Sequence, residues 1–160
     1  MKNLIELFSE LNDLNIKYVV INNWIGLPTN PPKEIQILCD NLSQFVRSSG
    51  LSKLIDNLYS FIPDGLDESS QQLFRLYEKG NNLFTQIFED ELLSFPNQNN
   101  GVKTPPSDKA FWIAMYMIRF HHEDLNKNTT YLEVIKNAME CRMGPIKKPS
   151  YRDLSEHFTF

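Results

Sequence analysis

The sequence is short of several features that mark common classes of protein. It has two cysteines among 160 residues, too few for the disulfide framework of a small secreted domain. Its six glycines are scattered and form neither a GxxxxGK(S/T) nor a GxGxxG phosphate loop. Acidic residues outnumber basic ones by 20 to 16, and the formal charge of -4 argues against a protein that coats a nucleic-acid polymer. Binding of a single nucleotide stays open.

The sequence also lacks a long apolar run. The longest, residues 110–118, has nine residues, and roughly 20 are needed to span a bilayer. The N-terminal segment MKNLIELFSELNDL is amphipathic and carries acids, which is unlike a signal peptide. We therefore expect a cytoplasmic protein that keeps Cys39 and Cys141 reduced and does not associate with membranes.

What the sequence does have suits one folded domain. The hydrophobic fraction of 41% and the charged fraction of 22% are ordinary for a globular protein. A chain of this length can enclose a sizeable core. Within the domain we expect an α/β core over residues 1–80, a helical part over 81–145 and a tail over 146–160.

Two short runs rich in β-branched residues predict neighbouring strands, at residues 18–21 and 35–39. The connection between them contains three prolines, which exclude a continuous helix or a central strand there. Polar residues stand where the strands meet this loop, a usual place for a functional site. They are Asn22, Asn23, Glu34 and Gln36.

Helical periodicity covers much of the rest of the chain. It predicts helices over residues 2–15, in a short segment after Asp40 or Asn41, and in the segment after Asn82. Two further helices start at Ser107 and at Thr130, the latter from a capping box of Thr130 and Glu133. The first of these two should bury a stripe made of Phe111, Met115, Ile118 and His122.

Three other segments have different patterns. Residues 72–77 (QLFRLY) alternate in polarity and predict a strand. Residues 51–62 fit a helix and a strand equally well. Residues 94–106, rich in Asn and Pro, predict a flexible loop. Together these elements indicate an α+β fold, in which a small mixed β-sheet is backed by helices and followed by a helical C-terminal half.

The strand–loop–strand segment reads YVVINN…LP…EIQILCD. It resembles the YVVLRN…LP…DIDILVD segment of small bacterial and viral members of the nucleotidyltransferase superfamily, which has the polymerase-β-like fold. FRLY…GN and TP…FWIAMYMIRFHH further along also match that family's FDIR…GD and VP…YFYSLLYHALYHK. The resemblance spans about residues 3–123 and implies the nucleotidyltransferase fold.

The family's catalytic residues do not carry over. Two carboxylates that alternate on one strand and a third on a neighbouring strand hold Mg²⁺ in the family. The matching positions are Glu34, Gln36 and Arg75. Arg75 would repel a divalent ion, because unit charges 4 Å apart interact by about 4 kcal/mol at an effective dielectric near 20. It can instead form a cross-strand pair with Glu34, so we expect neither a metal nor a cofactor.

Two regions are candidates for an interface with a partner. Trp24 lies on the long loop, where an exposed aromatic side chain can anchor a protein partner. The tail carries Lys147 and Lys148 and ends in Phe158-Thr159-Phe160, which suits a docking peptide.

Three functional hypotheses follow. The first is a catalytically degenerate nucleotidyltransferase-like domain, which favours a protein that is not an enzyme. It would bind a nucleotide-like ligand in its cleft, or a protein or a second copy on its surface. The cleft residues are Asn22, Asn23, Glu34, Gln36 and Arg75. The second is an active transferase that holds Mg²⁺ with Glu34, Gln36 and Asp40, assisted by Asp64 or Glu78. The third is a mostly helical viral interaction factor in the host cytoplasm.

Overall fold

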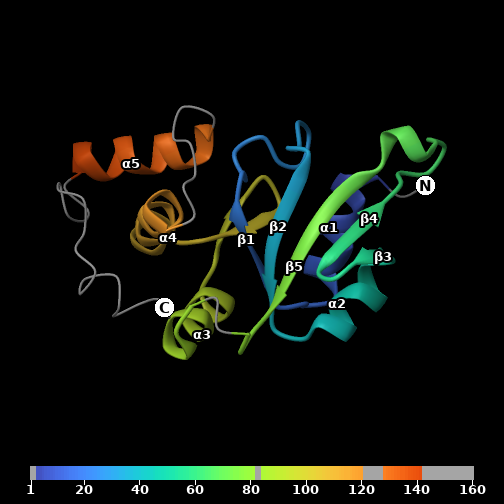
Figure 1. The fold of residues 1–160 in the computed structure, drawn as a ribbon, viewed down its shortest axis with the longest axis horizontal. Coiled ribbons are helices and arrows are strands. Elements are labelled where there is room, and N and C mark those ends of the chain that lie inside the picture. The colour runs from blue at the N-terminus through green and yellow to red at the C-terminus, as the bar shows by residue number, and fades with distance from the viewer. Residues whose placement is uncertain (1–2, 82–83, 121–127, 142–160) are drawn as a thin grey trace.

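The computed structural model describes residues 3–81, 84–120 and 128–141, and it shows an α+β architecture (Figure 1). For residues 68, 118–120 and 138–141 it describes the backbone alone. The α-helices are α1 (Leu4–Asp13), α2 (Leu42–Ser49), α3 (Gln86–Ser94), α4 (Ser107–Phe120) and α5 (Thr129–Cys141). The strands are β1 (Tyr18–Asn22), β2 (Glu34–Cys39), β3 (Ser52–Ile55), β4 (Leu58–Phe61), β5 (Gln72–Glu78), β6 (Asn97–Asn99) and β7 (Val102–Thr104).

Five strands form one mixed sheet in the order β1-β2-β5-β4-β3. β2 and β5 run parallel, and the other neighbouring pairs run antiparallel. A parallel pair needs a crossover connection, and the chain makes it through α2 and the β3–β4 hairpin. The predicted mixed sheet is therefore confirmed, and the hypothesis of a mostly helical protein is wrong.

Local signals place the first helices as the sequence predicts. The side chain of Asn3 accepts a hydrogen bond from the N–H of Glu6 at the start of α1. Asn41 does the same for Gln44 at the start of α2. Gly50 ends α2 in the left-handed conformation, at a φ of 73°, which glycine adopts without a steric penalty.

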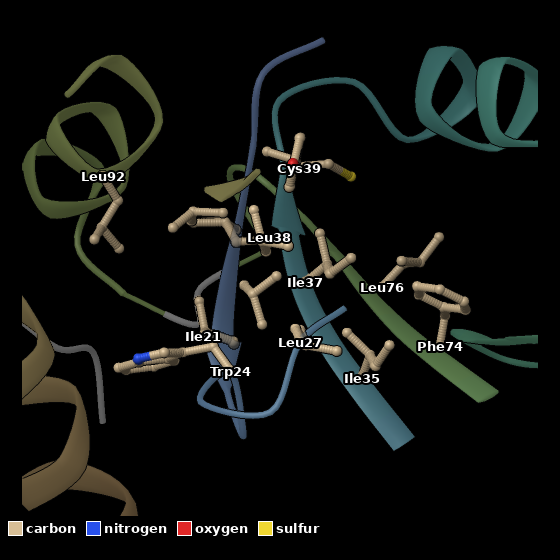
Figure 2. Packing of buried hydrophobic residues seen from close by; sticks show 14 of the residues in the cluster. Ile21, Trp24, Leu27, Ile35, Ile37, Leu38, Cys39, Phe74, Leu76 and Leu92 are labelled. Carbon is tan, nitrogen blue, oxygen red and sulfur yellow. The ribbon is translucent and has the colours of Figure 1, made fainter. Parts of the chain in front are cut away.

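Helices cover the two faces of the sheet differently. The ring of Tyr18 packs between Phe8 of α1 and Phe45 of α2, with centroids 5.9 and 6.0 Å away. In Figure 2, Ile37, Phe74 and Leu76 lie on one side of the strands, while Ile21, Trp24 and Leu92 lie on the other. Figure 1 shows α3, α4 and α5 beside β1, at the opposite end of the sheet from β3. The face that carries Ile21 and Trp24 is therefore covered by helices near β1 and less covered over β5 and β4.

The ambiguous segment 51–62 is a hairpin. β3 and β4 pair antiparallel across a tight turn in which Asp56 has a φ of 48°. Leu54 and Ile55, which suggested one face of a helix, are 50% and 63% exposed on the edge strand. Their helical spacing therefore does not mark a buried helix face.

The predicted flexible loop over 94–106 also contains a hairpin, so this expectation is wrong. β6 and β7 pair across Asn100-Gly101, where both residues have positive φ, as two-residue hairpin turns prefer. Val102 is buried, and Lys103 Nζ donates a hydrogen bond of 2.9 Å to the carbonyl of Ile16. Contacts with the start of β1 therefore hold a segment that its composition assigns to a loop.

The C-terminal helices start close to the predicted residues, but the cap of α5 and the buried stripe of α4 differ from the prediction. Asn128 caps α5, because its Oδ1 accepts the N–H of Tyr131 at 3.0 Å, and the predicted cap Thr130 is therefore the second residue of the helix. In α4 the buried side chains on the described part are Ala110, Phe111, Ile113, Ala114, Tyr116 and Met117. Met115, predicted to be in the buried stripe, is half-exposed, and the side chains of Ile118 and His122 lie outside the description. The segment predicted to be helical after Asn82 forms α3, which Thr85 caps.

None of the helices over the described ranges combines the length and the apolar character that crossing a bilayer requires.

Candidate functional site

The three positions that match the family's catalytic residues lie together on the sheet. Gln36 and Arg75 are direct partners on the parallel strands β2 and β5, and Glu34 is paired with Leu73, two residues before Arg75. Because side chains alternate along a strand, Glu34, Gln36 and Arg75 share one face. Each of them is half-buried.

A guanidinium–carboxylate pair occupies the centre of this face. Arg75 Nε donates to Glu34 Oε1 at 2.5 Å, and Nη2 donates to Oε2 at 3.4 Å. Arg75 Nη1 donates to Asn57 Oδ1 at 2.8 Å. A planar guanidinium suits this two-point contact with a carboxylate. The predicted Glu34–Arg75 pair is therefore confirmed, with Asn57 as a third member.

The charge of this face is close to zero, because the guanidinium and the carboxylate cancel. The hydrogen bond with Glu34 raises the pKa of Arg75 further, so the side chain stays cationic. Tyr77 lies two residues further along β5 on the same side, and burial raises the pKa of its hydroxyl. We call Glu34, Gln36, Asn57, Arg75 and Tyr77 the open face.

The ligand set of the active-transferase hypothesis is not assembled. Asp40 follows the last residue of β2, six positions from Glu34, which along a strand is about 20 Å. Two-metal sites hold their ions about 4 Å apart. Asp40 lies 4.0 Å from Lys79 Nζ instead, and Glu78 Oε2 accepts the N–H of Leu42 at the start of α2. Glu34, Gln36 and Asp40 therefore cannot share one ion.

The described residues contain no group of three or more His, Cys, Asp or Glu side chains with metal-site geometry. Cys39 also does not qualify as a nucleophile, because burial raises the pKa of its thiol to about 12.

The two asparagines at the end of β1 have structural surroundings. Asn22 pairs with Gln36 across the strands but is 1% exposed, and its Oδ1 accepts a hydrogen bond of 2.9 Å from Asn128 Nδ2. Asn23 adopts a φ of 53° at the turn. Of the predicted cleft residues, the structure therefore brings together Glu34, Gln36 and Arg75, and it removes Asn22 from solvent.

Trp24 is not an exposed anchor, so that prediction is wrong. Its side chain is 9% exposed, and its ring packs edge-on against Tyr131, with centroids 6.3 Å apart. The hydroxyl of Tyr131 donates to the carbonyl of Ile21 at 3.0 Å. The helix α5 therefore covers the tryptophan that the loop carries. The other interface candidates, Lys147, Lys148, Phe158 and Phe160, lie outside the described residues.

A pocket of about 530 Å³ lies apart from the open face. Its walls come from the β1–β2 loop, the β6–β7 hairpin and the two C-terminal helices. We call it the hairpin pocket. The sequence analysis missed it, because it exists only where the hairpin and α5 meet.

Comparison of the chain with family models, curated proteins and solved structures finds no match. The resemblance to the nucleotidyltransferase superfamily therefore stays a prediction.

Sequence reasoning also missed Asn57 and Asn128. Asn57 follows Asp56 in the turn of a hairpin that the sequence left ambiguous, and nothing local links it to Arg75, 18 positions away. Asn128 has a local signal, since an Asn before a helical segment is a common N-cap. Its second contact, with Asn22, spans 106 positions and has none.

Proposed function

We propose that this chain is a nucleotidyltransferase-like domain that has lost metal-dependent catalysis and acts by binding a nucleotide-like ligand or a protein partner. The contact between Arg75 and Glu34 is the observation that supports it. The resemblance supplies the fold family, and the contact explains why the retained acidic position would not hold Mg²⁺.

The physical argument rests on competition for Glu34. Both of its carboxylate oxygens contact the guanidinium, so a metal ion would have to displace that contact. The released guanidinium would then repel the ion, by about 4 kcal/mol for each unit of ionic charge at 4 Å and an effective dielectric near 20. Gln36 offers a neutral oxygen in place of a second carboxylate, which weakens binding of a hard cation further.

The open face can still bind a ligand. A guanidinium has five N–H groups, and three of those of Arg75 make the bonds to Glu34 and Asn57. Together with the Gln36 amide and the Tyr77 hydroxyl, the remaining donors suit a phosphate or a carboxylate oxygen. A nucleotide-like ligand and an acidic protein segment both carry such oxygens. We also propose a cytoplasmic location, which the low cysteine content supports.

The test measures turnover and binding separately. We expect no Mg²⁺-dependent transfer from ATP, CTP, GTP or UTP, and no calorimetric heat with Mg²⁺ alone. Turnover that Glu34→Ala abolishes would refute the proposal and support the active transferase.

Thermal shifts with the same nucleotides then separate the two kinds of partner. A shift that does not need Mg²⁺ and that Arg75→Gln reduces supports a nucleotide-like ligand on the open face. A matched control is Arg47→Gln, at an exposed position in the last turn of α2. No shift with any nucleotide leaves a protein partner as the binding target.

A further inference from the structure

The hairpin pocket combines the size of a small-molecule site with an unusual set of polar groups. Its volume of about 530 Å³ is within the range of ligand sites, about 300–1,000 Å³. The β6–β7 hairpin contributes Asn97 and Asn99 to the wall, and α5 contributes Glu133 and Asn137. Two segments that are separate in the sequence thus place amide and carboxylate groups around one space.

The side-chain charges of the pocket disfavour phosphorylated ligands. Among the described residues that line it there is no Lys, Arg or His, and Glu133 is the single carboxylate. A phosphate group would therefore lose its hydration without gaining a cationic partner, and Glu133 would repel it. This distinguishes the pocket from the open face, where Arg75 offers a cation.

The polar groups match hydroxyls instead. A hydroxyl both donates and accepts hydrogen bonds, and an asparagine amide offers both complements, while a carboxylate only accepts. Two neighbouring hydroxyls can donate to the two oxygens of Glu133. The amide of Asn99 is already oriented, because its Nδ2 donates to Thr104 Oγ1 at 2.6 Å. An oriented amide loses less conformational entropy when a ligand binds.

The apolar part of the pocket wall is suited to the apolar part of a ligand. Trp24 and Val134 line the pocket, and the Trp24 ring is held by its edge-on contact with Tyr131. The loop that carries it is fastened to α5, since Thr130 Oγ1 accepts the N–H of Ile25 at 3.3 Å. Trp24 is 9% exposed, so it forms a small part of the wall, and with Val134 it gives a fixed apolar surface against which the C–H groups of a sugar or a heterocycle can pack.

We propose that the hairpin pocket binds an uncharged molecule with vicinal hydroxyl groups, either a nucleoside or a free sugar. The shared chemistry is the diol, which Glu133 and the asparagine amides recognise while the apolar wall takes the rest. This inference goes beyond the proposed function and does not depend on the open face.

The experiment is a thermal-shift and calorimetric titration of the full chain. The probes are adenosine, cytidine, guanosine and uridine, then ribose, glucose and maltose, and finally the four nucleoside triphosphates. We expect at least one uncharged probe to raise the melting temperature. The nucleoside triphosphates should not compete with that probe for its site. Binding of nucleosides but not of free sugars identifies the first source, and the reverse identifies the second. No shift with any uncharged probe overturns the proposal.

Two variants locate the binding. Glu133→Gln removes a charged acceptor on the exposed surface of α5. It should lower the affinity for the probe that binds best roughly tenfold. Glu10→Gln, an exposed glutamate of α1, is the matched control and should leave the affinity unchanged. Equal affinities in the wild type and Glu133→Gln overturn the proposal.

Tryptophan fluorescence gives a readout at the pocket itself. The chain has two tryptophans, so a Trp112→Phe variant leaves Trp24 as the sole emitter. Trp112 lies outside the hairpin pocket, against Phe111. The bound probe should change the emission of Trp24, and binding without any change would place the probe elsewhere and overturn the proposal.

Discussion

Asn22 at the end of β1 and Asn128 at the start of α5 form a buried hydrogen bond of 2.9 Å across 106 positions of the chain. Asn128 also caps α5 through its Oδ1. Its amide group therefore uses its acceptor within the helix and its donor toward the sheet. This one side chain couples the start of the C-terminal helix to the strand that leads into the long loop.

Removing the Asn128 side chain should remove two separate contributions to the free energy of unfolding. Asn128→Ala removes an N-cap, worth about 1 kcal/mol, and removes the hydrogen bond that the buried Oδ1 of Asn22 accepts, which costs about 1–3 kcal/mol. We expect a loss of roughly 2–4 kcal/mol in the free energy of unfolding, measured by urea denaturation. Asn3→Ala, which removes an exposed N-cap on α1, is the control. Equal losses in the two variants would show that the contact with Asn22 contributes nothing.

Adding carboxylates to the open face should create a metal site. The variant Gln36→Asp with Arg75→Asp places three acids, with Glu34, on adjacent parallel strands, as two-metal sites require. We expect calorimetric binding of Mg²⁺ or Mn²⁺ that the wild type lacks. Lys53→Asp with Gln98→Asp makes the same change in net charge at exposed positions elsewhere. Binding of equal strength in this control would mean that net charge alone attracts the ion.

Glu89 should make stability depend on pH. The residue is 1% exposed, and its Oε1 accepts the N–H of Gly80 at 3.0 Å. Burial is the main cause that raises its pKa above the usual 4.5, and the nearby Asp90 adds to the rise. Because the folded state binds this proton more tightly than the unfolded chain, the stability it contributes is complete below about pH 4.5. That contribution is lost as the pH rises through the folded-state pKa.

The measurement compares the melting temperatures of the wild type and Glu89→Gln between pH 4 and 8. The difference between the two proteins should shift in favour of the variant as the pH rises, since the amide does not ionise. Glu91→Gln, an exposed neighbour on α3, controls for the loss of a surface charge. A difference that stays constant across the range would contradict the raised pKa.

The turn of the β6–β7 hairpin should be sensitive to backbone conformation. Gly101 has a φ of 80°, and a Cβ added there would meet no atom within 4 Å. Gly101→Ala should therefore cost about 1–2 kcal/mol in the free energy of unfolding through the left-handed backbone alone. Gly101→Asn should cost less, because asparagine tolerates this region better. Equal costs for the two variants would show that the turn relaxes to another conformation.

The sequence by itself determined the elements whose signals are local. The β-branched runs of β1 and β2, the alternation in β5 and the asparagine caps of α1 and α2 each act within a few residues. The contact of Glu34 with Arg75 could also be predicted, because opposite charges on the same face of neighbouring strands attract. The fold class and the Glu34–Arg75 contact of the open face follow from these signals.

Only the tertiary structure decided the rest. The Asn-rich segment becomes the β6–β7 hairpin because β7 packs beside β1 and Lys103 donates to the carbonyl of Ile16. Trp24, on an exposed-looking loop, is buried because Tyr131 of α5 packs against it. Contacts between residues more than a hundred positions apart leave no local pattern, since each partner is compatible with many surroundings until the chain brings the two together.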